Sequence, residues 1–528
     1  MSEFPIGNIK QLDYSFFYRA HPLDQQAYTH LVRRLELDAN FHPSGFRRKV
    51  LLISFSAYFA LFGALIGIGS LLYLGFNWAQ VHRSTYNMLR FGVFALILLP
   101  VFWMVLRMLF MRLPVPEGRH ITREEAPKLF DTIDKIRKKL NGPQIHHVLI
   151  DTHYNAAISQ LPRFALFGPH TNYLILGLPY LLGVTPKEML ATVAHEYGHL
   201  CGNHGKLGAW VYRQRRTFGT LYGQVRDNAH DNWAKSGMAF ALNRFMPYYN
   251  AYTFVLSRQD EVDADRTAND LVGAAINADS LVRDALLGRW IQQEFWPKLY
   301  QQADLKMSPS MMPFASMRTT FKASYDQWAT TERLTSALAE KSNLDDTHPA
   351  LKERLEATGQ SPALPGCTEI TAAEVLLSGT TSKNLIAEFD QAWWDKERKK
   401  WETRCKYVHR SMARLKELSA VPLDQVPLLD LQEFALLKGE FDTPTAAKPV
   451  LEHLLRQEGG PFPKAAFLYG QILLEEGNAA GLEHLEAAAR RDRSLTEEAA
   501  QIGYRFMLRY QSEGAAQTWM YRTQNLSA

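Results

Sequence analysis

The sequence predicts a mainly α-helical protein with a small β-sheet, an α+β fold that follows a transmembrane helical hairpin and precedes a helical repeat-like region. Three observations support this prediction: two long apolar runs near the N-terminus, a group of short β-branched segments after them, and helical periodicity over most of the remaining chain. At 528 residues the chain is too long for one compact core, so several folded units are expected.

The overall composition excludes several classes of protein. The 59 Lys and Arg residues nearly balance the 54 Asp and Glu residues, and a net charge of +5 gives no strong field for a polyanion, so we expect no nucleic-acid partner. A hydrophobic content of 46% excludes disorder as the main state. Cys201, Cys367 and Cys405 are too few and too widely spaced for a disulfide framework or a thiolate zinc site, which indicates a reducing compartment.

Two apolar runs predict the transmembrane hairpin. Val50 to Phe76 carries no charged residue and is long enough to cross a bilayer at about 1.5 Å per residue. Phe91 to Leu106 is shorter, and its Pro100 would kink a transmembrane helix without preventing it. We interpret both runs as spans in contact with the lipid bilayer. The alternative is a buried hairpin of a soluble protein.

Basic residues predict the orientation of this hairpin. Only Arg83 and Arg90 lie between the two runs, whereas the outer flanks carry Arg47, Arg48, Lys49, Arg107, Arg112, Arg119 and Arg123. Because basic residues concentrate on the cytoplasmic side, we expect both termini in the cytoplasm. The prediction is a multi-pass membrane protein, with the bacterial inner membrane as its location, whose chain after residue 113 faces the cytoplasm.

A helix-start signal follows the predicted sheet. An amphipathic helix is expected over residues 123–140, and short apolar segments at 146–150, 155–159 and 172–178 predict strands. Then Thr185 is a suitable N-cap, Pro186 suits the first helical position, and Glu188 is placed to close a capping box.

The helix that begins there carries a metal-binding pattern. His195 and His199 are four residues apart, so both imidazoles lie on one face of the helix and can bind one zinc ion. Glu196 beside them is placed to accept a proton from a water molecule that the metal has made more acidic. The pattern predicts one catalytic Zn²⁺, with Glu196 as the general base.

The third zinc ligand is found by elimination. No glutamate lies between Glu196 and Glu261, so a ligand about twenty residues after His199 has no candidate. The three-histidine pattern HExxHxxGxxH does not fit either. It requires a histidine at residue 205, which is glycine, and the next histidine is His204. The segment 257–265, SRQDEVDAD, remains. Glu261 is the predicted ligand, and Asp265, one turn later, is the predicted acceptor for a ligand histidine. The alternative is a solvated acidic helix start.

Four segments together resemble a known family. Residues 155–158, 174–204, 257–265 and 346–355 look like the landmark segments of the HtpX and CaaX prenyl endopeptidase type of membrane zinc peptidase, metallopeptidase family forty-eight. The similarity covers residues 114–360. It implies a gluzincin-like zinc peptidase domain with zinc held by His195, His199 and Glu261.

The resemblance also implies a substrate site. The strand that contains Asn155, Ala156 and Ala157 would be the edge against which the backbone of a polypeptide substrate pairs. His348 would lie near the catalytic cleft and position substrate or stabilise the oxyanion, with Arg354 bracing the loop. The alternative for His348 is a surface histidine at a Pro-broken helix start.

The chain departs from these relatives between the zinc helix and the third ligand. HtpX relatives often carry a second hydrophobic pair there, but this segment has many charged residues, including Arg213, Arg215, Arg216, Arg226, Asp227, Asp231, Lys235 and Arg244. Because charges cross a bilayer at high energetic cost, we expect a cytosolic peptidase domain tethered by one hairpin.

The C-terminal region contains a weak internal repeat. Residues 469–485 resemble residues 504–520 at a period of about 35, which is typical of tetratricopeptide-type helical hairpins. Such hairpins bind partner proteins, so a protein partner is predicted at this region, and the alternative is a helical tail docked on the peptidase domain.

The analysis of the residues thus favours a zinc metalloendopeptidase with a role in membrane-protein quality control or processing. The alternative is a membrane-tethered adaptor with a structural zinc centre and a partner-binding repeat. The predicted parts are an N-terminal cytoplasmic segment (1–46), a transmembrane hairpin (47–113), a zinc metallopeptidase domain (114–360), a helical connector (361–420) and a tetratricopeptide-like region (421–528).

Overall fold

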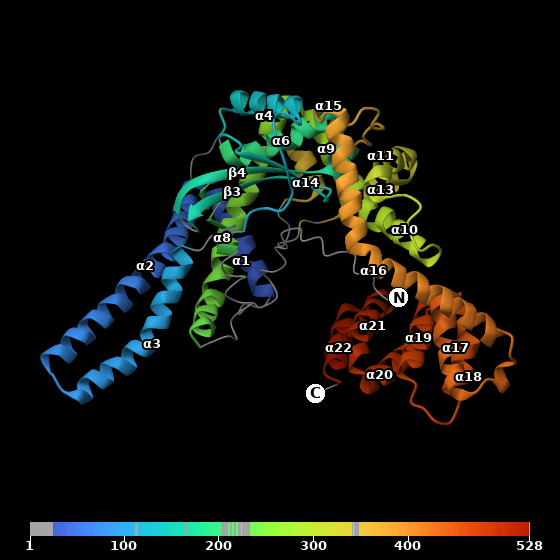
Figure 1. Ribbon diagram of the computed structural model, residues 1–528. Coiled ribbons are helices and arrows are strands. Elements are labelled where there is room, and N and C mark those ends of the chain that lie inside the picture. Colours follow the sequence, from blue (N-terminus) through green and yellow to red (C-terminus); the bar gives the residue numbers. More distant parts are fainter. Residues whose placement is uncertain are drawn as a thin grey trace. The chain divides into compact units, whose positions relative to one another are not determined.

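The computed structural model describes residues 25–110, 114–164, 167–201, 210–211, 214–215, 218–219, 223, 233–340, 342 and 348–526. Among the positions named above, Arg112, Arg213, Arg216, Arg226, Asp227, Asp231, His204 and residues 346–347 lie outside this set, as does most of the segment 1–46. The described chain is mostly helical and has one small mixed sheet, as the sequence predicts (Figure 1).

The chain divides into two compact units. The first takes in the described residues of Ile6–Pro297 and Met311–Asp395, and the second takes in those of Lys298–Ser310 and Lys396–Ala528. The long helix α16 (Gly379–Ser419) contributes residues to both units. The sheet and all the candidate site residues belong to the first unit.

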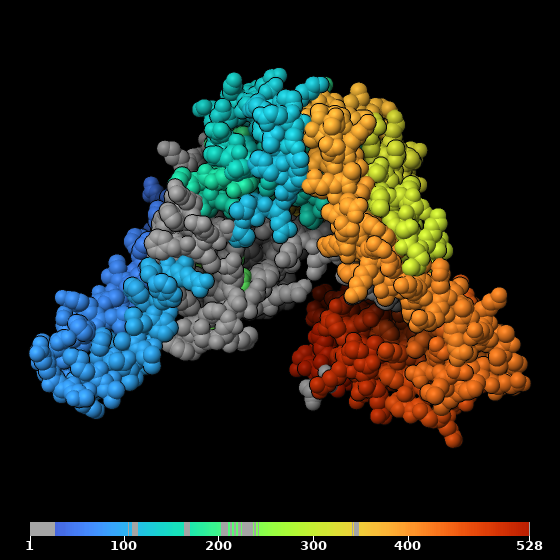
Figure 2. All heavy atoms as spheres, viewed as in Figure 1, coloured from blue at the N-terminus to red at the C-terminus, as the bar shows by residue number. Residues whose placement is uncertain are grey.

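Three helices open the first unit: α1 (Gln25–Phe41), α2 (Pro43–Val81) and α3 (Thr85–Phe110). Two of them, α2 and α3, are long and apolar enough to cross a membrane. Their apolar side chains remain largely exposed, and Figure 2 shows the connected ends of the two helices, in blue, extending away from the rest of the unit. Exposed apolar surface of this extent is typical of a contact with lipid or with another protein.

The sheet has the strand order β1-β2-β4-β3, with β3 at one edge. Its central pair, β2 and β4, is parallel, while β1 and β3 each pair with their neighbour in antiparallel orientation. The strands are β1 (Arg119–Ile121), β2 (His147–Asp151), β3 (Ala156–Phe164) and β4 (Phe167–Gly177), and α4 (Pro127–Leu140) lies between β1 and β2 in the chain.

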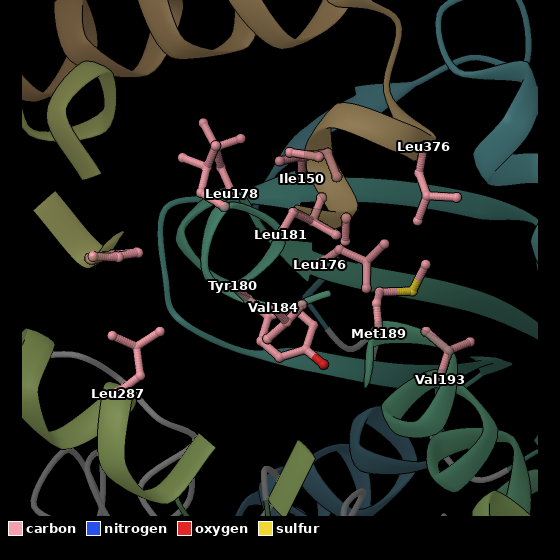
Figure 3. Packing of buried hydrophobic residues seen from close by; sticks show 14 of the residues in the cluster. Ile150, Leu176, Leu178, Tyr180, Leu181, Val184, Met189, Val193, Leu287 and Leu376 are labelled. Carbon is pink, nitrogen blue, oxygen red and sulfur yellow. The ribbon is translucent and has the colours of Figure 1, made fainter. Parts of the chain in front are cut away.

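Apolar residues of the central strands form a core with the helices that follow them. Leu176 at the end of β4 is fully buried, and Met189 and Val193 of α6 (Pro186–Cys201) point toward it (Figure 3). Leu178, Tyr180 and Leu181 of the short helix α5 (Leu178–Gly183) belong to the same core. Because α6 is anchored to the sheet through one apolar face, its polar residues are held at fixed positions on another face.

The helix α8 (Trp233–Val272) packs closely against α6. The other helices of the first unit are α9 (Ala274–Trp290), α10 (Trp296–Gln301, which crosses the unit boundary), α11 (Pro313–Ala323), α12 (Tyr325–Trp328), α13 (Thr331–Ala339), α14 (Leu351–Thr358) and α15 (Ala372–Leu376), with a π-helical turn at Ile291–Phe295.

The second unit consists of helices that pack in sequential pairs. They are α17 (Leu428–Phe441), α18 (Pro444–Leu455), α19 (Pro463–Glu475), α20 (Gly481–Arg491), α21 (Thr496–Tyr510) and α22 (Glu513–Gln524). The pairs α19–α20 and α21–α22 contain the two predicted repeats. Helical hairpins are therefore present, and their tetratricopeptide character stays a prediction.

Candidate metal centre

The start of α6 has the predicted cap. The backbone N–H of Thr185 donates to Oε2 of Glu188 at 2.7 Å, and the N–H of Glu188 donates to the Thr185 hydroxyl oxygen at 3.3 Å. Pro186 is the first residue of the helix, as predicted. This reciprocal capping satisfies two N–H groups that the first turn of a helix leaves without partners. It fixes the point from which α6 begins, and hence the position of the polar residues two to three turns later.

His195 and His199 lie side by side on α6. Their Nε2 atoms are 3.2 Å apart, and both side chains are buried. Burial lowers the pKa of His199, which favours the neutral imidazole. A neutral imidazole has a free nitrogen lone pair, which is the form that binds a metal ion.

A close helix contact brings the third residue to this pair. A Cβ atom built at Gly198 would lie 2.7 Å from Cα of Ala264, so the absence of a side chain at Gly198 lets α8 approach α6 closely. Ala264 is one turn after Glu261 on α8. As a result, Oε1 of Glu261 lies 3.3 Å from Nε2 of His199, and Oε2 lies 3.6 Å from Nε2 of His195.

These distances have the size expected for three ligands of one tetrahedral ion. Zinc binds nitrogen and oxygen at about 2.0–2.1 Å, so two ligand atoms at a tetrahedral angle stand about 3.3 Å apart. The separations among His195, His199 and Glu261 range from 3.2 to 3.6 Å. The three side chains therefore fit a metal ion without rearrangement.

His348 joins the same cluster in a different way. The potential ligand atoms of His195, His199, Glu261 and His348 all lie within 4.8 Å of one another, so the group could hold a metal ion. However, Nδ1 of His348 lies only 2.6 Å from Oε2 of Glu261. This distance is that of a hydrogen bond and is too short for two ligands of one zinc ion. His348 is thus placed as a donor to the ligand carboxylate, and the fourth coordination position has no protein ligand from these residues.

Asp265 and Arg354 fix the orientation of His195. Nδ1 of His195 lies 2.8 Å from Oδ1 of Asp265, and the guanidinium of Arg354 donates to both oxygens of that carboxylate, at 2.6 and 2.9 Å. Because Nδ1 donates to Asp265, the lone pair of His195 is on Nε2, which faces the cluster. A carboxylate behind a ligand histidine is a common feature of zinc sites.

The buried carboxylates are held as anions by their neighbours. Burial acts to raise the pKa of Asp265, but the charge and hydrogen bonds of Arg354 and the bond with His195 outweigh it and hold the pKa well below its ordinary value. Burial likewise acts to raise the pKa of Glu261, and the nearby imidazoles of His348 and His199 lower it overall. In turn, burial acts to lower the pKa of His348, and Glu261 raises it overall. Negative charge is thus concentrated where a divalent cation would bind.

Glu196 connects the centre to the edge strand. Its Oε2 accepts a hydrogen bond of 3.1 Å from the backbone N–H of Ile158 on β3. Since that N–H points away from β4, the alternation of the strand directs the backbone groups of Ala156 and Gln160 to the same outer edge. The carbonyl of Asn155 instead accepts from the N–H of Gly177. By the same alternation Ala157 also faces β4, so among the three predicted substrate residues Ala156 presents its backbone outward.

Three contributors to the centre were not foreseen in these roles. Gly198 allows α6 and α8 to approach each other closely, and the N–H of Ile158 donates to Glu196. Arg354 forms an ion pair with Asp265, a role that the prediction of a loop-bracing residue did not include. The small residue inside the HEYGH pattern was a signal for the first. The other two depend on contacts between segments that are distant in the sequence, and no local pattern indicates them.

A pair of histidines on one helix, a carboxylate from a second helix and a glutamate beside them define a metal-dependent hydrolase site. The comparison with known families agrees. Residues 166–360 match Peptidase family M48, a segment that contains all of the clustered residues, and the match supports a metallopeptidase of this family. No curated protein and no solved structure matches the chain.

Proposed function

We propose that the protein is a membrane-anchored zinc endopeptidase of the HtpX type, which cleaves polypeptides on the cytoplasmic side of the membrane. His195, His199 and Glu261 would hold one zinc ion. The observation that supports this proposal best is the set of separations among these three residues, with His348 at hydrogen-bond distance from Glu261 instead of at ligand distance. A three-ligand site is typical of catalysis, whereas structural zinc sites have four protein ligands. The structural-zinc adaptor is therefore less well supported.

The edge strand is the proposed substrate site. An extended polypeptide can pair with the outer edge of β3, where Ala156 and Gln160 present their N–H and carbonyl groups and Ile158, whose N–H is bound by Glu196, presents its carbonyl. The Glu196 carboxylate touches this edge at Ile158, so a bound chain would pass directly over the general base. This arrangement supports hydrolysis of an internal peptide bond.

The chemistry assigns one task to each side chain. A bound zinc ion supplies Lewis-acid polarisation of the scissile carbonyl and lowers the pKa of water. Glu196 accepts the proton of the attacking water and later delivers it to the departing amine. Asp265 and Arg354 keep His195 oriented, while His348 donates to the carboxylate of Glu261 and keeps 43% of its side chain exposed, where a substrate could contact it.

The remaining parts have proposed roles as well. The α2–α3 hairpin would span the bilayer, with both termini in the cytoplasm, and the helices α17–α22 would recruit a protein partner. Together these parts suit a peptidase for membrane-protein quality control or processing.

Glu196→Gln tests the proposed activity. The amide keeps the shape of the side chain but accepts no proton, so cleavage of an unfolded polypeptide should fall about 10²–10⁴-fold while zinc content is unchanged. Cleavage sites would be mapped by mass spectrometry with detergent-purified protein, and Glu332→Gln, an exposed glutamate of α13, is the matched control. Zinc-dependent proteolysis that persists in Glu196→Gln would contradict the proposal.

A further inference from the structure

Two histidines meet on the face of the sheet that points away from the core. Ile121 and Val148 are fully buried in the core, so the residue before each of them points to the opposite face. These preceding residues are His120 on β1 and His147 on β2. In the register of the two strands, His120 is opposite Leu149, which makes His147 its diagonal neighbour on the same face.

The distance between the two imidazoles suits a metal ion with right-angled coordination. Nε2 of His120 lies 3.0 Å from Nδ1 of His147. With metal–nitrogen bonds of about 2.0–2.1 Å, two ligand atoms at a right angle stand about 2.9 Å apart, and two at a tetrahedral angle about 3.3 Å apart. The pair thus fits neighbouring positions of a square-planar or octahedral ion, whereas the separations of 3.2 to 3.6 Å at the catalytic centre fit a tetrahedral one.

The side chain of His147 is held ready for such an ion. Its ring stacks on Tyr173 of the neighbouring strand β4, with centroids 4.8 Å apart. Burial and the nearby imidazoles of His120 and His146 lower the pKa of His147, which favours the neutral form that binds a metal. Because His120 is exposed, an ion can reach the pair from the solvent.

We propose that His120 and His147 bind a second metal ion, of the Ni²⁺ or Cu²⁺ class, with ligands separate from those of the catalytic centre. Imidazole suits these ions, and both favour tetragonal coordination. Among the described residues, the one group of three or more His, Cys, Asp or Glu ligands is that of the catalytic centre, so water fills the other positions of the second ion. With two protein ligands, this ion exchanges with the solvent.

A bound ion would link β1 to the rest of the sheet. This strand has only three residues and lies at an edge of the sheet. An ion that binds the paired strands, and not the separated ones, stabilises the pairing by its binding free energy. Because β1 is the first element after α3, the ion would stabilise the point at which the α2–α3 hairpin connects to the sheet. This inference does not depend on the proposed function.

Titration with Ni²⁺ tests the site. The full-length protein, purified in detergent and loaded with zinc, is titrated by calorimetry, and both metals are counted by mass spectrometry after gel filtration. We expect one Ni²⁺ per chain in the wild type. His120→Ala and His147→Ala should each lose this Ni²⁺ and keep the zinc content of the wild type. His409→Ala, which changes an exposed histidine of α16, is the matched control and should bind Ni²⁺ like the wild type.

Hydrogen exchange tests the link between the strands. Ni²⁺ should slow exchange of the backbone amides of residues 119–121 in the wild type, and have no such effect in His120→Ala. Equal Ni²⁺ uptake in the wild type and both histidine variants would indicate an adventitious ion only and would overturn the proposal. So would a wild type that takes up no Ni²⁺, as expected if the imidazoles form only a hydrogen bond, or one whose exchange does not respond. If His147→Ala loses zinc as well, which indicates a loss of fold, the exposed position His120 decides by itself.

Discussion

The metal centre and the α2–α3 hairpin break the usual burial pattern in opposite directions. At the centre, charged and polar side chains such as Glu261 and Asp265 are buried, at 5% and 2% exposure. On the hairpin, large apolar side chains such as Ile66 and Trp103 are exposed, at 68% and 64%. Proteins maintain either condition only when something stabilises it, so each region indicates a partner: a cation for the first, and lipid or another protein for the second.

Burial of charge does not by itself indicate a ligand, as a second buried pair in the same unit shows. Glu188 and Arg283 form an ion pair at 2.9 Å with both side chains almost fully buried, and Glu188 also closes the cap of α6. Both oxygens of Glu188 accept hydrogen bonds, from Nε of Arg283 and from the N–H of Thr185, and Nη2 of Arg283 donates to the carbonyl of Gly366. The metal centre differs because three groups with lone pairs or negative charge, His195, His199 and Glu261, converge on one point.

The largest expected effect comes from breaking that structural pair. Glu188→Ala leaves Arg283 buried without its anion and removes the cap, so the free energy of unfolding should fall by about 3–5 kcal/mol. Chemical denaturation in detergent measures this loss. The charge-preserving variant Glu188→Asp should retain part of the stability, and an unchanged denaturation midpoint in Glu188→Ala would show that the pair contributes little.

The hairpin is tested by a charge at its centre. If the exposed face of α2 contacts lipid, Ile66→Arg should raise the free energy of membrane insertion by about 2.5–3.5 kcal/mol. The protein would then shift from the membrane fraction to the soluble or degraded fraction in cells. Leu429→Arg, at a site of 82% exposure on α17, is the control. Equal behaviour of the two variants would show that the hairpin is not in the bilayer.

A smaller effect is expected behind the ligand histidine. Asp265→Ala removes the acceptor that orients His195, so metal affinity should fall about 10–100-fold while the three ligands remain. Competition with a chelator of known affinity measures this change. The control is Asp263→Ala, because Asp263 on the same helix forms an exposed ion pair with Arg266. Equal metal affinities in the two variants would show that Asp265 does not support metal binding at the centre.

The last prediction concerns pH. Burial raises the pKa of Asp284 to about 7, although a hydrogen bond from Tyr154 opposes the shift. The folded state then holds a proton that the unfolded state releases, so stability is full below the ordinary pKa near 4 and falls as pH rises to about 7. The slope is at most about 1.4 kcal/mol per pH unit. Asp284→Asn should flatten this dependence in denaturation at pH 5 and pH 7, while Asp326→Asn should not.

Local sequence patterns predicted the elements that carry the centre. The spacing of His195 and His199, the cap at Thr185 and the apolar runs of the hairpin each depend on residues within a few turns, and the structure confirms the helix start and the two long apolar helices. Elimination led to Glu261, which the structure brings to the histidines.

The remaining features depend on contacts across long sequence separations. Arg354 meets Asp265 from a position 89 residues later, and the N–H of Ile158 meets Glu196 from 38 residues earlier. No periodicity or motif encodes such a contact, because it arises only when the core has packed. For the same reason the orientation of β3, which decides that Ala156 faces outward and Asn155 inward, was not predictable.

The zinc content of purified variants tests the central claim most directly. After dialysis against a mild chelator, the wild-type protein should retain one zinc ion per chain, and so should the exposed-site control Glu332→Ala. Glu261→Ala and His199→Ala should each lose the metal, because two ligands hold zinc far more weakly than three. Full zinc occupancy in Glu261→Ala, with normal folding, would contradict the account.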